Sequence, residues 1–357
     1  MSDWKEERVH TIRARQDLPV SFSLDKKEEA FFAAEGQQDY QFAFAVTPYY
    51  FSLIGDSPDD PLRAQCIPRK DEFQIKKYEV LDPLWEDPYS PLPRMVHRYP
   101  NRVLLLVTDE CALYCRHCFR RYFASRRGGV ISPGQLRTIV EYLQLHTEVQ
   151  EVILSGGDPL VLEDTRISAL LHILRYEVGR TLVLRLASRI PVVMPQRITP
   201  QLVKILSQHS PVFMITQFNH SREITPASRQ AISSLVDAGV PVLNQAVLLK
   251  GVNDRAETLA ELFQGLLEMR VKPYYLFQGD LAAGTSHFRV PLAEGFDIMQ
   301  KLRGQISGLA MPVYAVDLPG GGGKIPLTEI FLEKLQKGWY CFIGPDGKRY
   351  YYPKEAP

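Results

Sequence analysis

The sequence predicts an α/β protein built on a parallel sheet that is covered by helices. From Arg102 onward, short apolar runs alternate with longer amphipathic stretches, which gives six strand–helix repeats. The short runs are almost continuously apolar, as strands are when both faces of a parallel sheet are buried. The longer stretches open on helix-start signals such as Ser132-Pro133 and Thr199-Pro200. Repeats of this kind place a helix after each parallel strand.

Each element has its own signal in the sequence. The strands are expected at 103–107, 151–154, 182–187, 212–216, 242–248 and 273–277. The helices are expected near 133–146, 164–177, 200–208, 226–237 and 255–269. Further start signals are Asp164, Thr225-Pro226 and Asn253-Asp254, and Gly239 is a C-terminal stop. A seventh short strand, 313–317, is expected after a helix near 294–306.

Length and composition exclude several classes of protein. With 357 residues the chain has room for one large α/β domain or two smaller ones. Its 42 basic and 41 acidic residues give no support for binding nucleic acid or a membrane surface. No apolar run reaches the roughly 18 residues of a membrane span, and the charged start lacks the apolar core of a secretion signal. Five cysteines form no disulfide framework in a chain of this length, so we expect a reducing, cytoplasmic location.

Residues 1–95 differ from the repeats that follow. A helix is expected from Lys26 to Ala34, with Phe31 and Phe32 on its apolar side. The segment from Asp82 to Arg94 holds four prolines and must be extended. We interpret it as a strap that wraps the main domain, the alternative being a disordered linker. The predicted organisation is an N-terminal helical and irregular region with the strap (1–95), the main domain (96–328) and a C-terminal tail (329–357) that is packed or makes a subunit contact.

Three cysteines follow the first predicted strand directly. Cys111, Cys115 and Cys118 have the spacing CxxxCxxC. Thiolates are soft ligands that suit zinc or an iron–sulfur cluster. A structural zinc site takes four protein ligands, whereas a cubane cluster held by three cysteines leaves one iron for a non-protein ligand. The spacing favours a cluster, and zinc with His117 as a fourth ligand is the alternative.

At these motifs the sequence resembles the lysine 2,3-aminomutase family, whose members are radical S-adenosylmethionine (SAM) enzymes that also use pyridoxal 5′-phosphate. The similarity rests on CALYCRHCFRR, SGGDPL and PGGGGK, and runs from about Arg98 to about Leu327. It implies an incomplete (β/α)6 barrel of the radical SAM type. It also implies an isomerase that interconverts L-α-lysine and β-lysine, by a 1,2-amino shift through a pyridoxal phosphate aldimine and a 5′-deoxyadenosyl radical.

The resemblance also implies the residues that hold the cofactors. Cys111, Cys115 and Cys118 would bind a [4Fe–4S] cluster. The residues that match the SAM-binding positions are Ser155, Gly156, Gly157, Asp158 and Gln245. Lys324, after four glycines, would be the catalytic lysine that binds pyridoxal phosphate, and Arg98 and Arg102 would bind its phosphate group. Arginine suits that role because its guanidinium fork fits a phosphate.

The charges of the substrate-binding residues implied by the resemblance indicate the class of substrate. Arg120 matches the residue that grips the substrate carboxylate, and Asp280 and Asp317 match the two that receive the far amino group of lysine. A pair of aspartates selects a cationic side chain and repels an anionic one. The expected substrate is therefore lysine, ornithine or arginine and not glutamate.

Two positions depart from the family pattern. Gln217 stands where relatives commonly have the first histidine of His-Phe-Asn-His, and Cys341 is alone where well-known members have a C-terminal zinc site, so no zinc is expected. The expected partners are an amino acid substrate, an external electron donor such as flavodoxin or ferredoxin, and further copies of the chain. The alternative functions are an arginine or ornithine 2,3-aminomutase, a lysine aminomutase linked to elongation factor P, and a zinc-binding scaffold.

Overall fold

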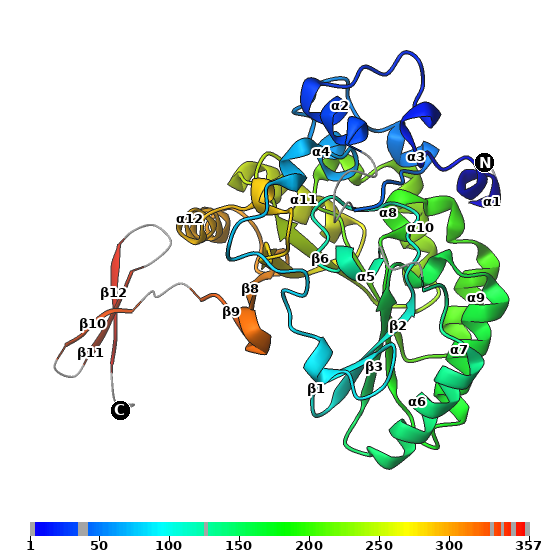
Figure 1. Cartoon of the computed structure of the whole chain (residues 1–357). Coiled ribbons are helices and arrows are strands. Elements are labelled where there is room, and N and C mark those ends of the chain that lie inside the picture. The colour runs from blue at the N-terminus through cyan, green and yellow to red at the C-terminus, as the bar shows by residue number, and fades with distance from the viewer. Residues whose placement is uncertain are drawn as a thin grey trace.

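A curled nine-stranded sheet organises the main body of the protein (Figure 1). The computed structural model describes residues 4–34, 42–124, 128–328, 332–336, 339–343 and 348–353. The strands follow one another across the sheet in chain order: β1 (Met95–Tyr99), β2 (Arg102–Thr108), β3 (Glu151–Gly156), β4 (Val183–Ala187), β5 (Val212–Thr216), β6 (Val242–Leu248), β7 (Lys272–Gln278), β8 (Val313–Leu318) and β9 (Gly323–Pro326). Strands β2 to β8 are parallel to their neighbours, which confirms the incomplete parallel barrel.

The two edges of the sheet hold strands that the sequence analysis did not predict. β1 pairs antiparallel with β2, and β9 pairs antiparallel with β8. Both are short, and their apolar residues are too few to give a strand pattern. They matter for function because Arg98 lies on β1 and Lys324 lies on β9.

Helices cover the outer face of the curled sheet (Figure 1). The long ones are α6 (Pro133–Leu145), α7 (Asp164–Tyr176), α9 (Pro200–Gln208), α10 (Pro226–Asp237), α11 (Ala256–Glu268) and α12 (Leu292–Arg303). Ser132, Thr199 and Thr225 cap three of them with their side-chain oxygens, as predicted. Asp164 does not cap α7 but is its first residue, and the Asn253 side chain instead accepts a hydrogen bond from Leu249 N within the loop.

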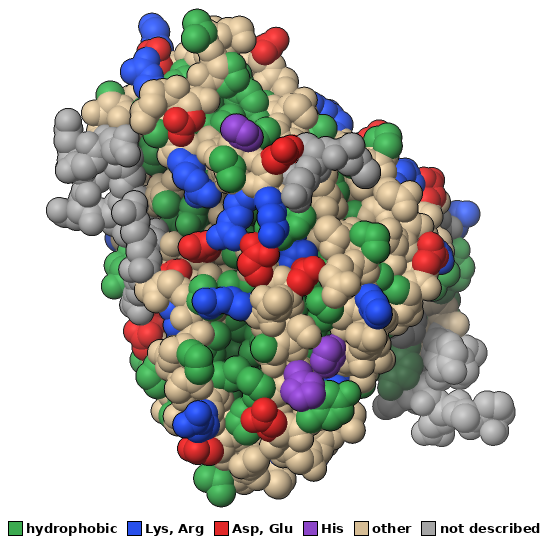
Figure 2. All heavy atoms as spheres, turned by 90° about the vertical axis from the view of Figure 1, so that its right-hand side faces the viewer, with side chains coloured by type: hydrophobic (Ala, Val, Ile, Leu, Met, Phe, Trp, Pro, Cys, Tyr) green, Lys and Arg blue, Asp and Glu red, His purple; other side chains and the backbone are tan. Residues whose placement is uncertain are grey.

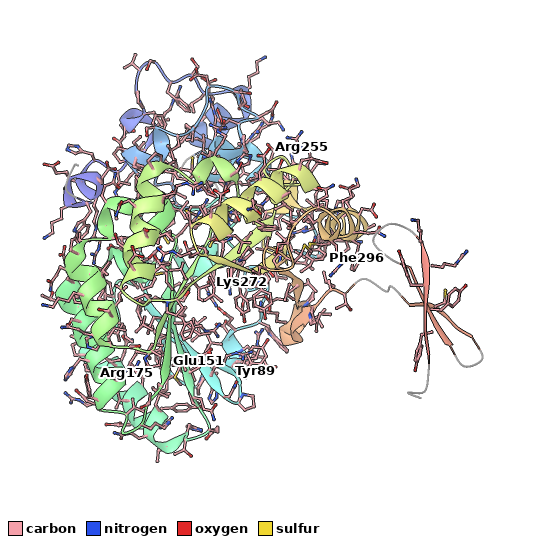
Figure 3. The ribbon with its side chains drawn as sticks, turned by 180° about the vertical axis from the view of Figure 1, so that it is seen from behind. Tyr89, Glu151, Arg175, Arg255, Lys272 and Phe296 are labelled. Atoms are coloured by element: carbon pink, nitrogen blue, oxygen red, sulfur yellow. The ribbon has the colours of Figure 1, made fainter. Side chains whose placement is uncertain are left out.

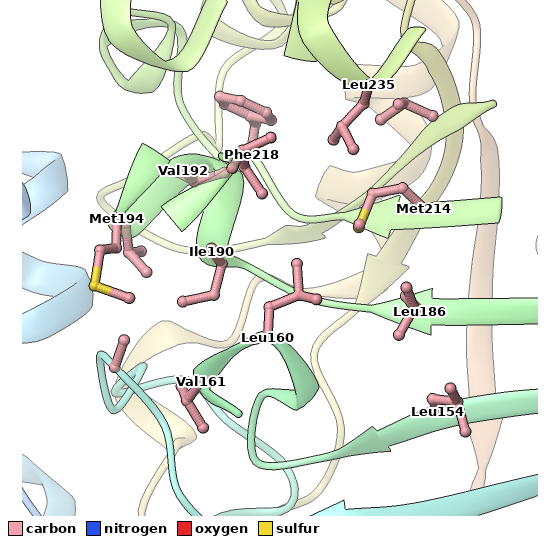
Figure 4. Packing of buried hydrophobic residues seen from close by; sticks show 14 of the residues in the cluster. Leu154, Leu160, Val161, Leu186, Ile190, Val192, Met194, Met214, Phe218 and Leu235 are labelled. Atoms are coloured by element: carbon pink, nitrogen blue, oxygen red, sulfur yellow. The ribbon is translucent and has the colours of Figure 1, made fainter. Parts of the chain in front are cut away.

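The core lies between the sheet and these helices. Leu154, Leu186 and Met214 occupy neighbouring positions on β3, β4 and β5 and are fully buried or nearly so (Figure 4). Leucines from α7 and α9 complete this layer from the outside. Burial of each such side chain contributes about 1.5–3 kcal/mol. The result is a rigid frame whose carboxyl ends carry the loops described below.

The N-terminal region lies over one end of the barrel (Figure 1). Its helices are α1 (Trp4–Val9), α2 (Lys26–Ala33), α3 (Pro48–Phe51) and α4 (Pro61–Cys66), and two further short helices are α5 (Arg121–Ala124) and α8 (Ile190–Val193). Buried ion pairs fix this region to the loop that follows β2. Glu72 accepts from Arg116 at 2.6 Å and also from Arg121, and all three side chains are at most 3% exposed. Such a triad is costly to break because it would leave a buried charge without a partner.

The chain also contains single 3-10 turns and a small separate sheet. The turns are Arg15–Asp17, Lys70–Phe73, Asp87–Tyr89, Pro159–Val161, Pro195–Arg197, Ser221–Glu223, Ser286–Phe288 and Pro319–Gly321. The sheet is formed by β10 (Leu332–Gln336), β11 (Trp339–Ile343) and β12 (Arg349–Pro353), which pair antiparallel and stand apart from the main body (Figure 1). Parts of the predicted tail 329–357 lie outside the described residues.

The surface carries a balanced mixture of charges. Acidic and basic side chains are interspersed on the face that Figure 2 shows, in keeping with a net charge of +1. Among the residues that the structure describes, no helix is both long and apolar enough to cross a membrane.

Candidate active site

Backbone hydrogen bonds and the buried Arg116–Glu72 ion pair hold the cysteine loop against the N-terminal region. Tyr114 N donates to Ala45 O at 3.0 Å, and Arg116 N donates to Gln65 O at 2.9 Å. The loop has no regular secondary structure between Asp109 and Arg120. Its shape therefore depends on these tertiary contacts rather than on a local helix or strand.

The three thiols lie near one another in the loop that follows β2. Burial and the neighbouring thiols raise the pKa of Cys111 well above its usual range and that of Cys118 to about 11. The raised pKa favours the protonated form of the Cys111 and Cys118 thiols in the free chain, and a cationic metal centre would release these protons and bind the thiolates. In the described part of the chain, no three His, Cys, Asp or Glu side chains converge on a single-ion site. The donor set fits an iron–sulfur cluster, for which thiolates are the usual ligands.

Arg189 is a neighbour of the cysteine loop that the sequence analysis missed. Its Nη1 donates to Cys115 Sγ at 2.8 Å, while its Nη2 donates to Glu223 at 2.7 Å and to Gln65 at 2.6 Å. A cation that donates to a ligand sulfur stabilises the thiolate and tunes the metal centre. Arg189 follows β4 by two residues, and that position after a parallel strand was the signal that could have identified it.

Two glycines let the end of β3 approach the cysteine loop. A Cβ atom on Gly156 would lie 2.2 Å from Thr108 O, and one on Gly157 would lie 2.2 Å from Glu110 O. Gly156 also has φ of +117°, which other residues avoid. No side chain fits here, so the SGGD segment is built for close backbone approach, as the predicted SAM-binding role requires.

The two polar members of this segment lie in different surroundings. Ser155 Oγ lies 3.5 Å from Arg120 Nη1, facing the barrel mouth. Asp158 is buried and accepts from Ser188 Oγ at 2.7 Å and from Arg189 N at 2.8 Å, and burial raises its pKa to about 6. Its contacts are those of a residue that fixes the β3 and β4 loops against one another.

The predicted pyridoxal lysine lies among acidic and aromatic side chains. Lys324 Nζ lies 2.6 Å from Asp317 Oδ2 and 3.8 Å from the centre of the Phe277 ring. Burial lowers the pKa of Lys324, against the opposing effect of Asp317. A lysine with a lowered pKa is a better nucleophile toward an aldehyde. Lys324 follows a turn in which Gly320, Gly321 and Gly323 have positive φ, and its own N donates to Tyr99 Oη at 2.9 Å.

Asp280 joins this group from the loop after β7. Burial, and then the negative charge of Asp317, raise the pKa of Asp280 to about 7, while Lys324 and Arg120 act in the opposite direction. The charges of Arg120, Asp317 and Lys324 thus all act on Asp280, although the four residues come from four separate segments. Two carboxylates beside the Lys324 ammonium can attract a second positively charged group.

The predicted phosphate-binding arginines lie on the first two strands. Arg98 on β1 donates from Nη2 to the Leu84 and Trp85 carbonyls, and its buried Nε has no hydrogen-bond partner in the structure. A buried donor without a partner is costly and marks a place where an anion would be accepted. Arg102 lies over the Tyr99 ring at 4.1 Å, and its charge acts on Lys324. These positions fit a phosphate group near Lys324.

Arg120 has a partner that the sequence did not reveal. Its Nε and Nη2 donate to the two carboxylate oxygens of Glu86, at 3.1 and 2.5 Å. Glu86 belongs to the proline-rich segment, more than thirty residues before Arg120 in the chain. Nothing in its local sequence distinguishes it from the other acidic residues of that segment.

Gln217 lies directly after β5, and Gln245 lies in the middle of β6. Gln217 Nε2 lies 3.1 Å from His117 Nε2, so the amide stands directly against the histidine of the cysteine motif. His117 Nδ1 is buried without a hydrogen-bond partner in the structure, and burial lowers the pKa of this imidazole well below its usual range. Gln245 is half-buried on β6, and its predicted role near SAM stays a prediction.

A cavity of about 620 Å³ lies on the outer side of the cysteine loop. Cys111 is the one predicted site residue in its lining, which otherwise comes from the N-terminal region and from residues 109–129, 161 and 194. It does not include Lys324 or either substrate aspartate.

Two family models match the chain. The model of the Radical SAM superfamily matches residues 105–263, and the model described as Lysine-2,3-aminomutase matches residues 299–336. The first match contains the three cysteines and the SGGD segment. The second contains Asp317 and Lys324. The two halves of the site are thus matched separately.

Individual proteins are similar over most of the chain. L-lysine 2,3-aminomutase of Acetoanaerobium sticklandii is 44% identical over 329 residues, covering 91% of this chain and 78% of that protein. L-lysine 2,3-aminomutase of Clostridium subterminale is 43% identical over 327 residues, with 91% and 78% covered. Glutamate 2,3-aminomutase of Clostridioides difficile is 41% identical over 333 residues, with 93% and 78% covered. Among solved structures, a radical SAM methyltransferase from Sphaerobacter thermophilus matches 62% of this chain and 68% of that chain, with 16% identity and a TM-score of 0.46.

Proposed function

Because the chain belongs to the lysine 2,3-aminomutase family of radical SAM enzymes, we propose that it interconverts L-α-lysine and β-lysine. Membership of the family makes the protein an isomerase of the aminomutase type and implies a [4Fe–4S] cluster and S-adenosylmethionine. The choice of lysine, the use of pyridoxal phosphate and the roles of individual residues are the proposal.

The observation that carries the choice of substrate is the acidic pair opposite an arginine. Asp280 and Asp317 face the same space as Lys324, and Arg120 lies within electrostatic range of Asp280. An α-amino acid with a cationic side chain has a carboxylate for the arginine and a far ammonium group for the aspartates. Glutamate would bring a second carboxylate toward two carboxylates, at a cost of several kcal/mol in a partly buried site.

In this proposal the residues of the chain bind the cofactors, orient the substrate and exclude water from the site. Cys111, Cys115 and Cys118 would hold the cluster, with the SGGD backbone beside it, and Lys324, Arg98 and Arg102 would hold pyridoxal phosphate. When bound, these groups supply one-electron chemistry for hydrogen abstraction and an aldehyde for the migrating amino group. Arg120, Asp280 and Asp317 fix the two ends of the substrate so that carbons 2 and 3 face the reacting groups.

The external partners follow from the same chemistry. A reduced cluster needs a one-electron donor, and we propose a small redox protein such as a flavodoxin or ferredoxin. We also propose that the chain forms a homo-oligomer through its C-terminal tail, since β10–β12 stand apart from the body of the protein.

The proposal is tested by anaerobic reconstitution with iron, sulfide, pyridoxal phosphate and SAM, followed by reduction with dithionite. The reconstituted protein is then given lysine, ornithine, arginine and glutamate separately, and β-amino acids are identified by mass spectrometry and NMR. Formation of β-lysine at the highest kcat/KM supports the proposal. A preference for ornithine or arginine would support the proposed role of the two aspartates but identify a different substrate. A preference for glutamate would refute the role of both aspartates.

A further inference from the structure

The guanidinium group of Arg120 is paired with a carboxylate along its Nε–Nη2 edge, and its Nη1 makes only a long contact with a serine hydroxyl. Glu86 accepts from Nε and Nη2 in the two-point geometry typical of strong arginine–carboxylate pairs. The third nitrogen, Nη1, points elsewhere and lies 3.5 Å from Ser155 Oγ at the end of β3. The Arg120 and Glu86 side chains are 13% and 17% exposed, so water screens the pair little. An arginine so held presents its Nη1 side in a fixed direction.

The segment that carries Glu86 is shaped for this contact. Asp82 Oδ2 accepts from Glu86 N at 2.6 Å and from Asp87 N at 3.3 Å, which closes a turn around Glu86. Trp85, directly before it, has φ of +52°, a conformation that bulky residues avoid. Backbone strain of this kind persists only where surrounding contacts enforce it, and it is concentrated at functional sites.

The same segment also contacts Arg98 and the glycine turn that precedes Lys324. The Leu84 and Trp85 carbonyls accept from Arg98, and the Tyr89 ring lies 4.9 Å from the Arg98 guanidinium. Trp85 and Tyr89 also pack on the glycine turn before Lys324, since a Cβ on Gly321 would lie 2.8 Å from the Tyr89 ring and 3.3 Å from the Trp85 ring. Tyr89 is labelled in Figure 3. Residues 82–90 thus contact Arg120, Arg98 and the glycine turn that precedes Lys324.

We propose that Glu86 is a positioning residue for Arg120, holding its Nε–Nη2 edge so that the Nη1 side receives the carboxylate of the amino acid substrate. This inference rests on the proposed function, in which Arg120 binds that carboxylate. Substrate recognition then depends on residues 82–90, which precede the barrel in the sequence. The opposite arrangement is a Glu86 that occupies the place of the substrate carboxylate and must leave before the substrate binds.

The two arrangements predict opposite effects of Glu86→Gln. If Glu86 positions Arg120, the amide leaves the guanidinium loosely held, and KM for lysine rises roughly 10-fold while kcat changes little. The preference for lysine over lysinamide falls by a similar factor, because that preference reports the carboxylate contact alone. If Glu86 is a placeholder, the same substitution lowers KM for lysine, and this result overturns the proposal.

Three further measurements keep the test decisive. Asp82→Asn loosens the turn around Glu86 without touching Arg120 and should raise KM in the same direction by a smaller factor. Glu268→Gln makes the same chemical change at an exposed ion pair with Arg229 and should leave KM unchanged. Iron content, the pyridoxal absorbance band and the Tm of each variant establish that it is folded and loaded. An unchanged KM in a loaded Glu86→Gln enzyme refutes the proposal, whereas wild-type protein inactive on every amino acid refutes the proposed function instead.

Discussion

Asp317 and Lys324 face each other across the β8–β9 ladder, with 2.6 Å between Asp317 Oδ2 and Lys324 Nζ. The register of two antiparallel strands therefore sets this contact, and not a flexible loop. In the cofactor-free chain, the Lys324 ammonium occupies a position beside Asp317 that a substrate ammonium would need. If Lys324 holds the pyridoxal aldehyde as we propose, Asp317 would be left to a second cation, and the pair would serve two successive tasks.

This relationship predicts different outcomes for the two partners. Lys324→Ala should abolish the absorbance band of bound pyridoxal phosphate and all turnover, because the only covalent anchor we propose is gone. Asp317→Asn should keep that band and lower kcat/KM for lysine by roughly 100-fold, since a charged partner of the substrate is removed. Absorbance spectra and steady-state assays measure the two effects. A pyridoxal band retained by Lys324→Ala would contradict the assignment.

Asp280 predicts a pH-dependent stability of the cofactor-free protein. Its pKa is about 7 in the folded chain against an ordinary value of 3.8. The contribution of Asp280 to stability is fully present below the pKa that this carboxyl has in the unfolded chain. It is lost as pH rises toward 7, because only the unfolded chain gives up the proton in that window. Asp280→Asn should therefore raise the free energy of unfolding relative to wild type. This gain should be larger at pH 8 than at pH 5, by about 2–3 kcal/mol. Urea unfolding at the two pH values measures this, and an equal gain at both would contradict the raised pKa.

The SGGD segment predicts a steric effect on cluster binding. Gly157→Ala should prevent stoichiometric iron loading, because its Cβ would meet Glu110 O at 2.2 Å, one residue before Cys111. Gly134→Ala is a matched control, since Gly134 lies in α6 and its nearest neighbour would be 3.9 Å away. The control should load iron normally and be stabilised by about 0.5–1 kcal/mol. Iron analysis and electron paramagnetic resonance distinguish the two, and full loading of Gly157→Ala would be inconsistent with a tight approach.

Glu72 predicts a coupling between the N-terminal region and the cysteine loop. Glu72→Gln removes the carboxylate that pairs with the buried Arg116 and Arg121 guanidinium groups, and we expect a loss of about 3–5 kcal/mol in the free energy of unfolding. Arg116 lies between Cys115 and Cys118, so iron loading should fall as well. Glu148→Gln, which removes an exposed contact with His146, is the control and should change stability little. Equal stability of the two variants would argue against the coupling.

Most of the barrel could be predicted from the sequence, and the reason is local. The predicted strands 212–216 and 242–248 and the helices 200–208 and 226–237 agree with β5, β6, α9 and α10. Each carries its own hydrophobic period and its own start or stop residue. The edge strands β1 and β9 were missed because pairing with a neighbour, rather than their own composition, makes them strands.

By itself, the sequence determined which reactive groups this protein carries, namely three thiols at a fixed spacing and a lysine after four glycines. Tertiary structure alone decided which of these groups meet. The pairing of Glu86 with Arg120, the donation from Arg189 to Cys115 and the register that sets Lys324 against Asp317 each join segments that no local pattern relates. Such contacts depend on the curvature of the sheet and on the path of the N-terminal region, which only the folded chain fixes.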